Sequence, residues 1–208
     1  MEQIAYREMA ATEQAHWWFL ARRNIIADTI KSFNLPPHSK ILEVGAGTGG
    51  NLKLLQRFGD LSAVEMNDYA RAYATQVTGV GVEYGFLPDS LPDYPHKFDL
   101  ICMFDVLEHV EKDLESLKVL ATRLNPGGRV LITVPAYPWM WTDHDVVLHH
   151  YRLYANSPLR RYKSCRASTG SADQFQYVAI SGCDSCEVGR ERTRKKRIAR
   201  KRLTATIC

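Results

Sequence analysis

A short, largely apolar run that ends in a cluster of glycines constrains the fold of this chain more than any other feature. The run is Lys40-Ile-Leu-Glu-Val44, and Gly45-Ala-Gly-Thr-Gly-Gly50 follows it directly. Such runs bounded by glycine are typical of buried strands in parallel sheets. Glycine lets the chain turn tightly and lets a ligand approach the backbone. The segment therefore predicts a strand, a ligand-binding turn and the start of a helix.

Apolar runs and helical patterns alternate along the next ninety residues. Further strands are expected at 61–65, 82–84, 98–104 and 129–135, and helices at 50–58, 67–77 and 113–124. A single helix is expected over 1–33, before Pro36 and Pro37. Strands that alternate with helices predict an α/β fold with a doubly wound, mostly parallel sheet and an N-terminal helical extension. Ligands of such sheets bind beyond the carboxyl ends of the strands.

The charges and the cysteines divide the chain at about residue 161. The 208 residues include 27 Lys and Arg and 23 Asp and Glu, with a net charge of +4. Residues 162–208 carry eleven of these basic and four of these acidic residues, and they also carry four of the five cysteines. The body is thus mildly acidic and the tail strongly basic. No apolar stretch of 18 residues and no secretory signal is visible, so we expect a cytoplasmic protein.

The glycine turn and an acidic strand end predict a nucleoside-binding site. Gly45, Gly47 and Gly50 satisfy the pattern G-x-G-x-x-G, and Glu65 follows at the end of the second expected strand, where its carboxylate can accept both hydrogen bonds of a ribose diol. This arrangement fits a nicotinamide dinucleotide equally well. However, Glu43 precedes the turn and would repel a pyrophosphate. A carboxylate there favours a ligand with an ammonium or sulfonium, such as S-adenosylmethionine.

Four segments in this order resemble the class I S-adenosylmethionine-dependent methyltransferases. They are Leu42–Gly49, the strand end at Glu65, Phe98–Val110 with its Asp-Val-Leu-Glu-His stretch, and Leu124–Ile132 with its Asn-Pro-Gly-Gly turn. The resemblance covers about residues 39–135. It implies a Rossmann-like methyltransferase sheet, methyl transfer from S-adenosylmethionine, and a cofactor-binding domain over residues 39–161.

The resemblance also implies which residues line the cofactor. The turn and its neighbours would hold the amino-acid and ribose parts: Glu43, Gly45, Ala46, Gly47 and Gly49. Glu65 would hold the ribose hydroxyls, and Met66 would pack on the adenine. Phe104 and Asp105 would face the methionine portion and the methyl group.

One position departs from the family pattern at the adenine. Phe86 and Leu87 follow Gly85 and are expected near the adenine edge, but many relatives carry an aspartate where Phe86 stands. Stacking or a main-chain contact would then replace the carboxylate contact to the adenine amine.

The segment His16-Trp-Trp-Phe19 resembles the lead helix of bacterial methyltransferases often encoded among polysaccharide and glycolipid functions. We expect residues 1–38 to form a helical lid in which Trp18 touches the cofactor and either Arg22 or Arg23 pairs with its carboxylate. Simple packing of the tryptophans against the sheet is the alternative.

A loop after the fifth expected strand lies on the substrate side. It contains Asp143-His-Asp145 and His149-His-Tyr-Arg152, which is similar to a family loop that ends in Gly-His-Tyr-Arg-Arg-Tyr, although His149 and Leu153 depart from it. His144 and His150 are our candidates for a base that removes a proton from a hydroxyl acceptor. Bracing of the loop is the competing role. The spacing does not favour a metal site.

The tail over residues 162–208 does not show the apolar alternation that should end such a sheet. It is rich in Ser, Cys and Gly, ends in a basic run, and only Tyr177-Val-Ala-Ile180 resembles a strand. A nucleic-acid-binding arm and a zinc knuckle at Cys183 and Cys186 are two interpretations. We favour a third, an altered reading frame near residues 153–162, and expect a disordered or aberrant tail.

The sequence predicts an S-adenosylmethionine-dependent methyltransferase that acts, at oxygen, on a small-molecule, sugar or lipid-linked acceptor. A lipid-linked acceptor is compatible with a peripheral membrane contact, whereas we do not expect nucleic acid as a partner. The alternatives are a catalytically degenerate cofactor-binding protein and a nucleic-acid methyltransferase that uses the basic tail.

Overall fold

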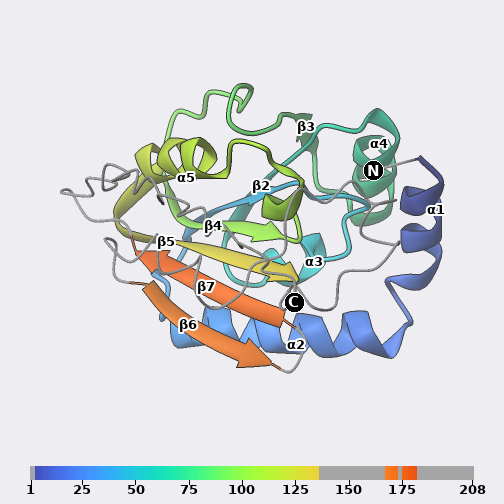
Figure 1. Cartoon of the computed structure of the whole chain (residues 1–208), viewed down its shortest axis with the longest axis horizontal. Helices are drawn as coiled ribbons and strands as arrows, with labels where there is room; N and C mark the ends of the chain where they lie inside the picture. Colours follow the sequence, from blue (N-terminus) through green and yellow to red (C-terminus); the bar gives the residue numbers. More distant parts are fainter. Residues whose placement is uncertain (1–2, 136–166, 173–174, 182–208) are drawn as a thin grey trace, which may run out of the picture.

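The computed structural model describes residues 3–135, 167–172 and 175–181, and these form an α/β fold around a seven-stranded sheet (Figure 1). The strand order is β3-β2-β1-β4-β5-β7-β6. The first five strands pair in parallel, and β7 and β6 are antiparallel additions beside β5. This confirms the expected doubly wound, mostly parallel sheet. The strands are β1 (Lys40–Val44), β2 (Asp60–Glu65), β3 (Val82–Tyr84), β4 (Phe98–Phe104), β5 (Leu124–Pro135), β6 (Ala167–Ala172) and β7 (Phe175–Ser181).

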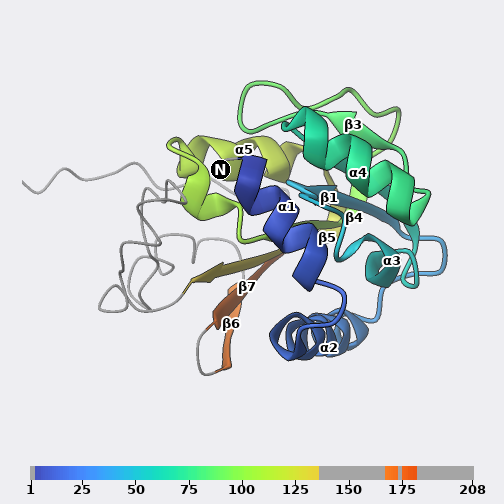
Figure 2. The ribbon, with the colours of Figure 1, turned by 90° about the vertical axis from the view of Figure 1, so that its right-hand side faces the viewer.

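Helices cover both faces of the sheet (Figure 2). One face carries α2, α3 and α4, and the other carries α5 and a short 3-10 helix, η1. The helices are α1 (Gln3–Thr12), α2 (Trp17–Ser32), α3 (Leu52–Leu55), α4 (Asp68–Thr78), η1 (Leu107–His109) and α5 (Asp113–Thr122). The remaining helix, α1, belongs to neither layer and lies at the edge where the parallel strands end.

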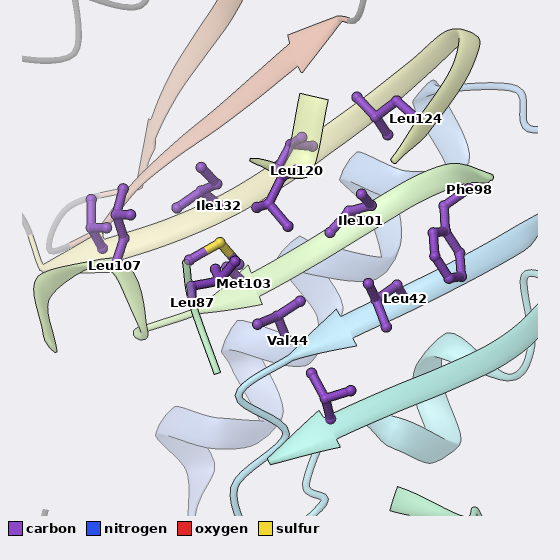
Figure 3. Packing of buried hydrophobic residues seen from close by; sticks show 13 residues of the cluster. Leu42, Val44, Leu87, Phe98, Ile101, Met103, Leu107, Leu120, Leu124 and Ile132 are labelled. Carbon is purple, nitrogen blue, oxygen red and sulfur yellow. The ribbon is translucent and has the colours of Figure 1, made fainter. Parts of the chain in front are cut away.

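Side chains from the central strands and α5 fill the core on one face (Figure 3). Leu42, Ile101 and Met103 are buried on β1 and β4, and Leu120 of α5 packs against them. Burial of apolar side chains on both faces of a strand removes their surface from water, which stabilises the fold by about 25 cal/mol for each Å². This packing fixes the positions of β1 and β4, and thus of the residues that follow their carboxyl ends.

The N-terminal extension is two helices, so the expectation of one helix over 1–33 was wrong. The chain leaves α1 after Thr12 and begins α2 at Trp17, where the Nδ1 atom of His16 accepts a hydrogen bond of 3.3 Å from the Trp18 N–H. A side chain that caps the first free amides of a helix defines where that helix begins. His16 is thus a helix cap, and the break lets α1 turn away from α2.

The expected disordered tail also needs correction. Residues 167–172 and 175–181 are strands, and β7 pairs with β5 from Arg129↔Ser181 to Pro135↔Phe175. β7 contains Tyr177–Ile180, the one tail segment whose sequence resembles a strand, whereas β6 is rich in Ser and Ala and pairs with β7. Strand pairing uses backbone amides and carbonyls, so a segment such as β6 can extend a sheet without an apolar pattern. The pairing covers the edge of β5, which would otherwise be exposed. Cys183, Cys186 and the basic run lie outside the described residues.

Gly59 allows β1 and β2 to begin side by side. A Cβ atom at Gly59 would clash with the carbonyl oxygen of Ser39, whereas one at Gly81 would meet no atom of the described part of the chain within 4 Å. We expect Gly59→Ala to lower the free energy of unfolding by about 2–3 kcal/mol, because the backbone must shift. Gly81→Ala should leave it unchanged or raise it by a few tenths of a kcal/mol. Urea unfolding of both variants tests this, and equal stabilities would contradict it.

Candidate functional site

The carboxyl ends of β1, β2 and β4 meet at one edge of the sheet and bring the predicted residues together. β1 runs into the glycine turn at Gly45, β2 ends at Glu65, and Asp105 directly follows β4. The helix α1 passes over this edge (Figures 1 and 2). The polar residues at the edge are therefore partly enclosed rather than open to solvent.

The glycine turn presents one residue to open space. Gly47 has a φ of +54°, and among the described residues a Cβ atom there would meet only the sulfur of Met9, at 4.0 Å. Gly49, with a φ of +89°, instead faces α4, because its Cβ would lie 3.0 Å from the Cβ of Ala74. Gly47 thus leaves room for a ligand, while Gly49 serves helix packing.

Glu65 holds the turn and the start of the next helix through its carboxylate. The Gly47 N–H donates to Oε2 at 2.9 Å, and the Asn67 N–H donates to Oε1 at 2.8 Å. The Tyr6 hydroxyl of α1 donates to Oε1 at 3.4 Å. Glu65 is 3% exposed, so its carboxylate oxygens are shielded from water, and hydrogen bonds to them are stronger than they would be at the surface. Its position matches the expected ribose carboxylate.

The carboxyl group of Glu43 is buried, and only one of its two oxygens has a hydrogen-bond partner among the described residues. It is 1% exposed, Asn51 donates to its Oε1 at 3.4 Å, and Oε2 has no hydrogen-bond partner among the described residues. Burial raises the pKa of Glu43 to about 8, and the nearby Glu13 and Glu65 add to the rise. A bound cation would favour the ionised form of this carboxyl.

Arg22 links α2 to the ends of β4 and β5. Its guanidinium lies 2.6 Å from Asp105 Oδ2 and donates to Thr133 Oγ1 at 2.7 Å, and the Thr133 hydroxyl donates to Asp105 Oδ1 at 3.1 Å. Asp105 has a φ of +55°, an uncommon conformation for a residue other than glycine. The ring of Trp18 lies against Arg22, 5.4 Å from its Cζ atom. The carboxylate partner of Arg22 in this structure is therefore Asp105.

The other predicted residues occupy different environments. Met66 is 60% exposed at the site, whereas Leu87 and Phe104 are buried in the two core layers and Ala46 is buried in a third cluster. The backbone N–H and carbonyl of Phe86 are both bonded to Ser90, at 2.8 and 3.0 Å. His144 and His150 lie outside the described residues.

Sequence reasoning missed Tyr6 of α1 and Glu13, which directly follows this helix. Tyr6 reaches Glu65, and Glu13, which is 4% exposed, accepts a hydrogen bond of 2.9 Å from the Thr48 hydroxyl in the glycine turn. Arg23 of α2 in turn donates to the Glu13 carbonyl at 2.8 Å. The signal was the spacing of Tyr6, Met9 and Glu13, which places them on one face of a helix. A hydropathy pattern does not reveal this face, because Tyr6 and Glu13 carry polar groups.

Glu108 of η1 was considered in the sequence only as a member of a family stretch. It is fully buried, and neither carboxyl oxygen has a hydrogen-bond partner among the described residues. Burial, with the neighbouring Asp105, raises its pKa well above the ordinary value. Within residues 3–135 and the two tail strands, no cluster of His, Cys, Asp and Glu could hold a metal ion, and no helix is long and apolar enough to span a membrane.

The raised pKa of Glu43 predicts a pH-dependent stability. In the unfolded chain this carboxyl ionises near 4.5, whereas in the folded protein it keeps its proton to about pH 8. The folded state therefore binds more protons between these values, and the contribution of Glu43 to stability falls as the pH rises. We expect the free energy of unfolding, relative to Glu43→Gln, to decrease by up to about 4 kcal/mol from pH 5 to pH 8.

Urea unfolding of both proteins at several pH values measures this difference. Titrations of groups far from Glu43 cancel in the comparison. A difference that stays constant across the range would contradict the assignment.

Comparisons with known proteins agree with this geometry. A family model described as a methyltransferase domain matches residues 18–181, which include every strand of the sheet. An uncharacterized methyltransferase of Staphylococcus carnosus is 33% identical over 96 residues, which are 45% of each chain. A ubiquinone biosynthesis O-methyltransferase of Xylella fastidiosa is 32% identical over 103 residues, 46% of this chain and 41% of the relative. The chain thus spans less than half of the length of these curated relatives.

The fold is similar to solved structures at low sequence identity. One is the SAM-bound amino pentose methyltransferase of Micromonospora echinaspora, involved in calicheamicin biosynthesis. It superposes with a TM-score of 0.60 and 13% identity, over 86% of this chain and 98% of that chain.

Proposed function

The chain belongs to the methyltransferase-domain family, and from this premise we propose that it methylates a small-molecule, sugar or lipid-linked acceptor at oxygen. S-adenosylmethionine is the methyl donor. The observation that carries the proposal is the buried carboxylate of Glu65 beside the open face of Gly47. Together they offer acceptors for a ribose diol and a backbone that a ligand can approach.

The charge of the site supports this cofactor over a dinucleotide. Glu13, Glu43 and Glu65 surround the turn, and Glu43 Oε2 has no partner among the described residues. A pyrophosphate would meet three carboxyls there, whereas S-adenosylmethionine carries an ammonium and a sulfonium and no phosphate. The residues present therefore fit this cofactor.

We assign each part of the cofactor to a part of the site. Glu65 accepts from the ribose hydroxyls, and Met66 with Phe86 and Leu87 borders the adenine. The amino-acid part lies along Gly45 and Ala46, with Glu43 near its ammonium. Asp105 and Phe104 end the site on the methyl side, which α2 covers with Trp18 and Arg22.

When bound, the cofactor supplies a methyl group on a sulfonium, which is already a good leaving group. The protein's own share is to hold the acceptor in line with that methyl group and to exclude water. For a hydroxyl acceptor one base must take the proton, and His144 and His150 are the proposed bases. The O-methyltransferase among the relatives supports oxygen as the acceptor atom.

The experiment that tests the proposal has two steps. Isothermal titration with S-adenosylmethionine and S-adenosylhomocysteine measures cofactor binding. A screen of hydroxylated sugars, phenols and lipid-linked sugars with labelled cofactor then measures transfer. Binding with transfer to an alcohol or phenol supports the proposal, whereas absence of binding by the folded protein rejects it.

Glu65→Ala should weaken binding of S-adenosylhomocysteine by about 1–3 kcal/mol, because two ribose hydroxyls lose an ionised acceptor. The matched control is Glu83→Ala, which removes an exposed carboxylate from β3. Titration of both variants tests this, with circular dichroism to verify folding. Unchanged affinity in Glu65→Ala would reject the assignment of Glu65.

Gly47→Val should abolish cofactor binding and have a smaller effect on stability. The new side chain would fill the space in front of the turn, and the φ of +54° costs about 1–2 kcal/mol for a residue with a Cβ. Near-native thermal unfolding with no detectable binding is the expected result. Binding at the wild-type level would show that this space is not used by the cofactor.

A further inference from the structure

One face of α1 is seated in the site assigned to the cofactor. Tyr6 and Met9 share this face with Glu13, which directly follows the helix and donates its N–H to the Met9 carbonyl. Each of the three meets a different part of the glycine turn or its partner. Tyr6 bonds Glu65, the sulfur of Met9 lies 4.0 Å from the point that a Cβ of Gly47 would take, and Glu13 bonds Thr48. The family match begins at residue 18, so α1 lies outside the matched residues.

The Glu65 carboxylate has too few free acceptor positions for all its partners and a ribose. Its two oxygens offer about four lone-pair positions. The N–H groups of Gly47 and Asn67 and the Tyr6 hydroxyl take three of these. A ribose diol brings two more donors, so one present donor must leave when both bind.

Tyr6 is the donor that can leave. Gly47 and Asn67 donate from the backbone of the turn and of the α4 cap, which are fixed by the sheet and the helix. Tyr6 donates from a side chain on a separate helix, at the longest of the three distances, 3.4 Å. Burial and Glu65 raise the pKa of Tyr6, so the hydroxyl stays protonated and acts as a donor, like a ribose hydroxyl.

We propose that α1 competes with the cofactor for its site, with the Tyr6 hydroxyl in the place of a ribose hydroxyl and Met9 over Gly47. Tyr6 and Met9 then set the affinity for the cofactor from outside the matched family region. Binding moves the first turns of α1 outward, while its last residues stay attached through Glu13, Thr48 and Arg23. This inference rests on the proposed cofactor site.

The test is titration of S-adenosylhomocysteine into the full chain and its variants. Tyr6→Phe keeps the ring and removes the competing donor, so we expect binding three- to fivefold tighter than in the wild type. Met9→Ala should also tighten binding. The control is Ile4→Ala, since Ile4 lies on α1 but is 67% exposed, and its affinity should equal that of the wild type.

Hydrogen exchange gives a second, independent result. If α1 is displaced, amides of residues 3–12 exchange faster after addition of S-adenosylhomocysteine, while those of β1 and β2 exchange more slowly. Unchanged or weaker binding by Tyr6→Phe, or slower exchange in α1, would overturn the proposal and show that α1 closes over the bound cofactor. If neither the folded wild type nor either variant binds, the proposed cofactor site itself fails, whereas binding by the variants alone would support strong competition.

Discussion

The carboxylate of Glu65 is the interaction on which the rest of the site depends. It joins the end of β2 to the turn after β1, through Gly47, and to the start of α4, through Asn67. One buried side chain thereby joins the end of β2 and the start of α4 to a turn that lies 18 residues earlier in the chain. Because the turn keeps its shape through this acceptor, the backbone around Gly47 is prepared for a ligand before any ligand arrives.

The electrostatics of the site follow from an excess of carboxyls over cations. Glu13, Glu43 and Glu108 are all buried, and burial raises the pKa of each. Arg22 lies near this group but is paired with Asp105. Part of the group therefore keeps its protons in the ligand-free protein, and a cationic ligand would stabilise the ionised forms. This favours a sulfonium cofactor on electrostatic grounds alone.

Much of the fold and half of the site could be predicted from the sequence, because they depend on local patterns. The apolar run before Gly45 predicted the sheet correctly, and the structure brings Gly47 and Glu65 together at one edge of it. Tyr6 and Glu13 escaped prediction because their burial arises only when α1 folds back over the turn. In the tail, β7 includes the strand-like Tyr177–Ile180, whereas β6 escaped prediction because its backbone pairing to β7 needs no apolar alternation.

The helix α2 connects the two sides of the site through neighbouring arginines. Arg23 holds the carbonyl of Glu13 at the end of α1, and Arg22 holds Asp105 and Thr133 at the ends of β4 and β5. α2 itself is fixed to the sheet by Ile26, Ala27 and Ile30. Since this helix is anchored, the chain just after α1 is held through Glu13, whereas the first turns of α1 are joined to the site through Tyr6. The proposed competition therefore needs only the contacts of these first turns to break, while the pairing of Arg22 with Asp105 on the other side of the site is kept.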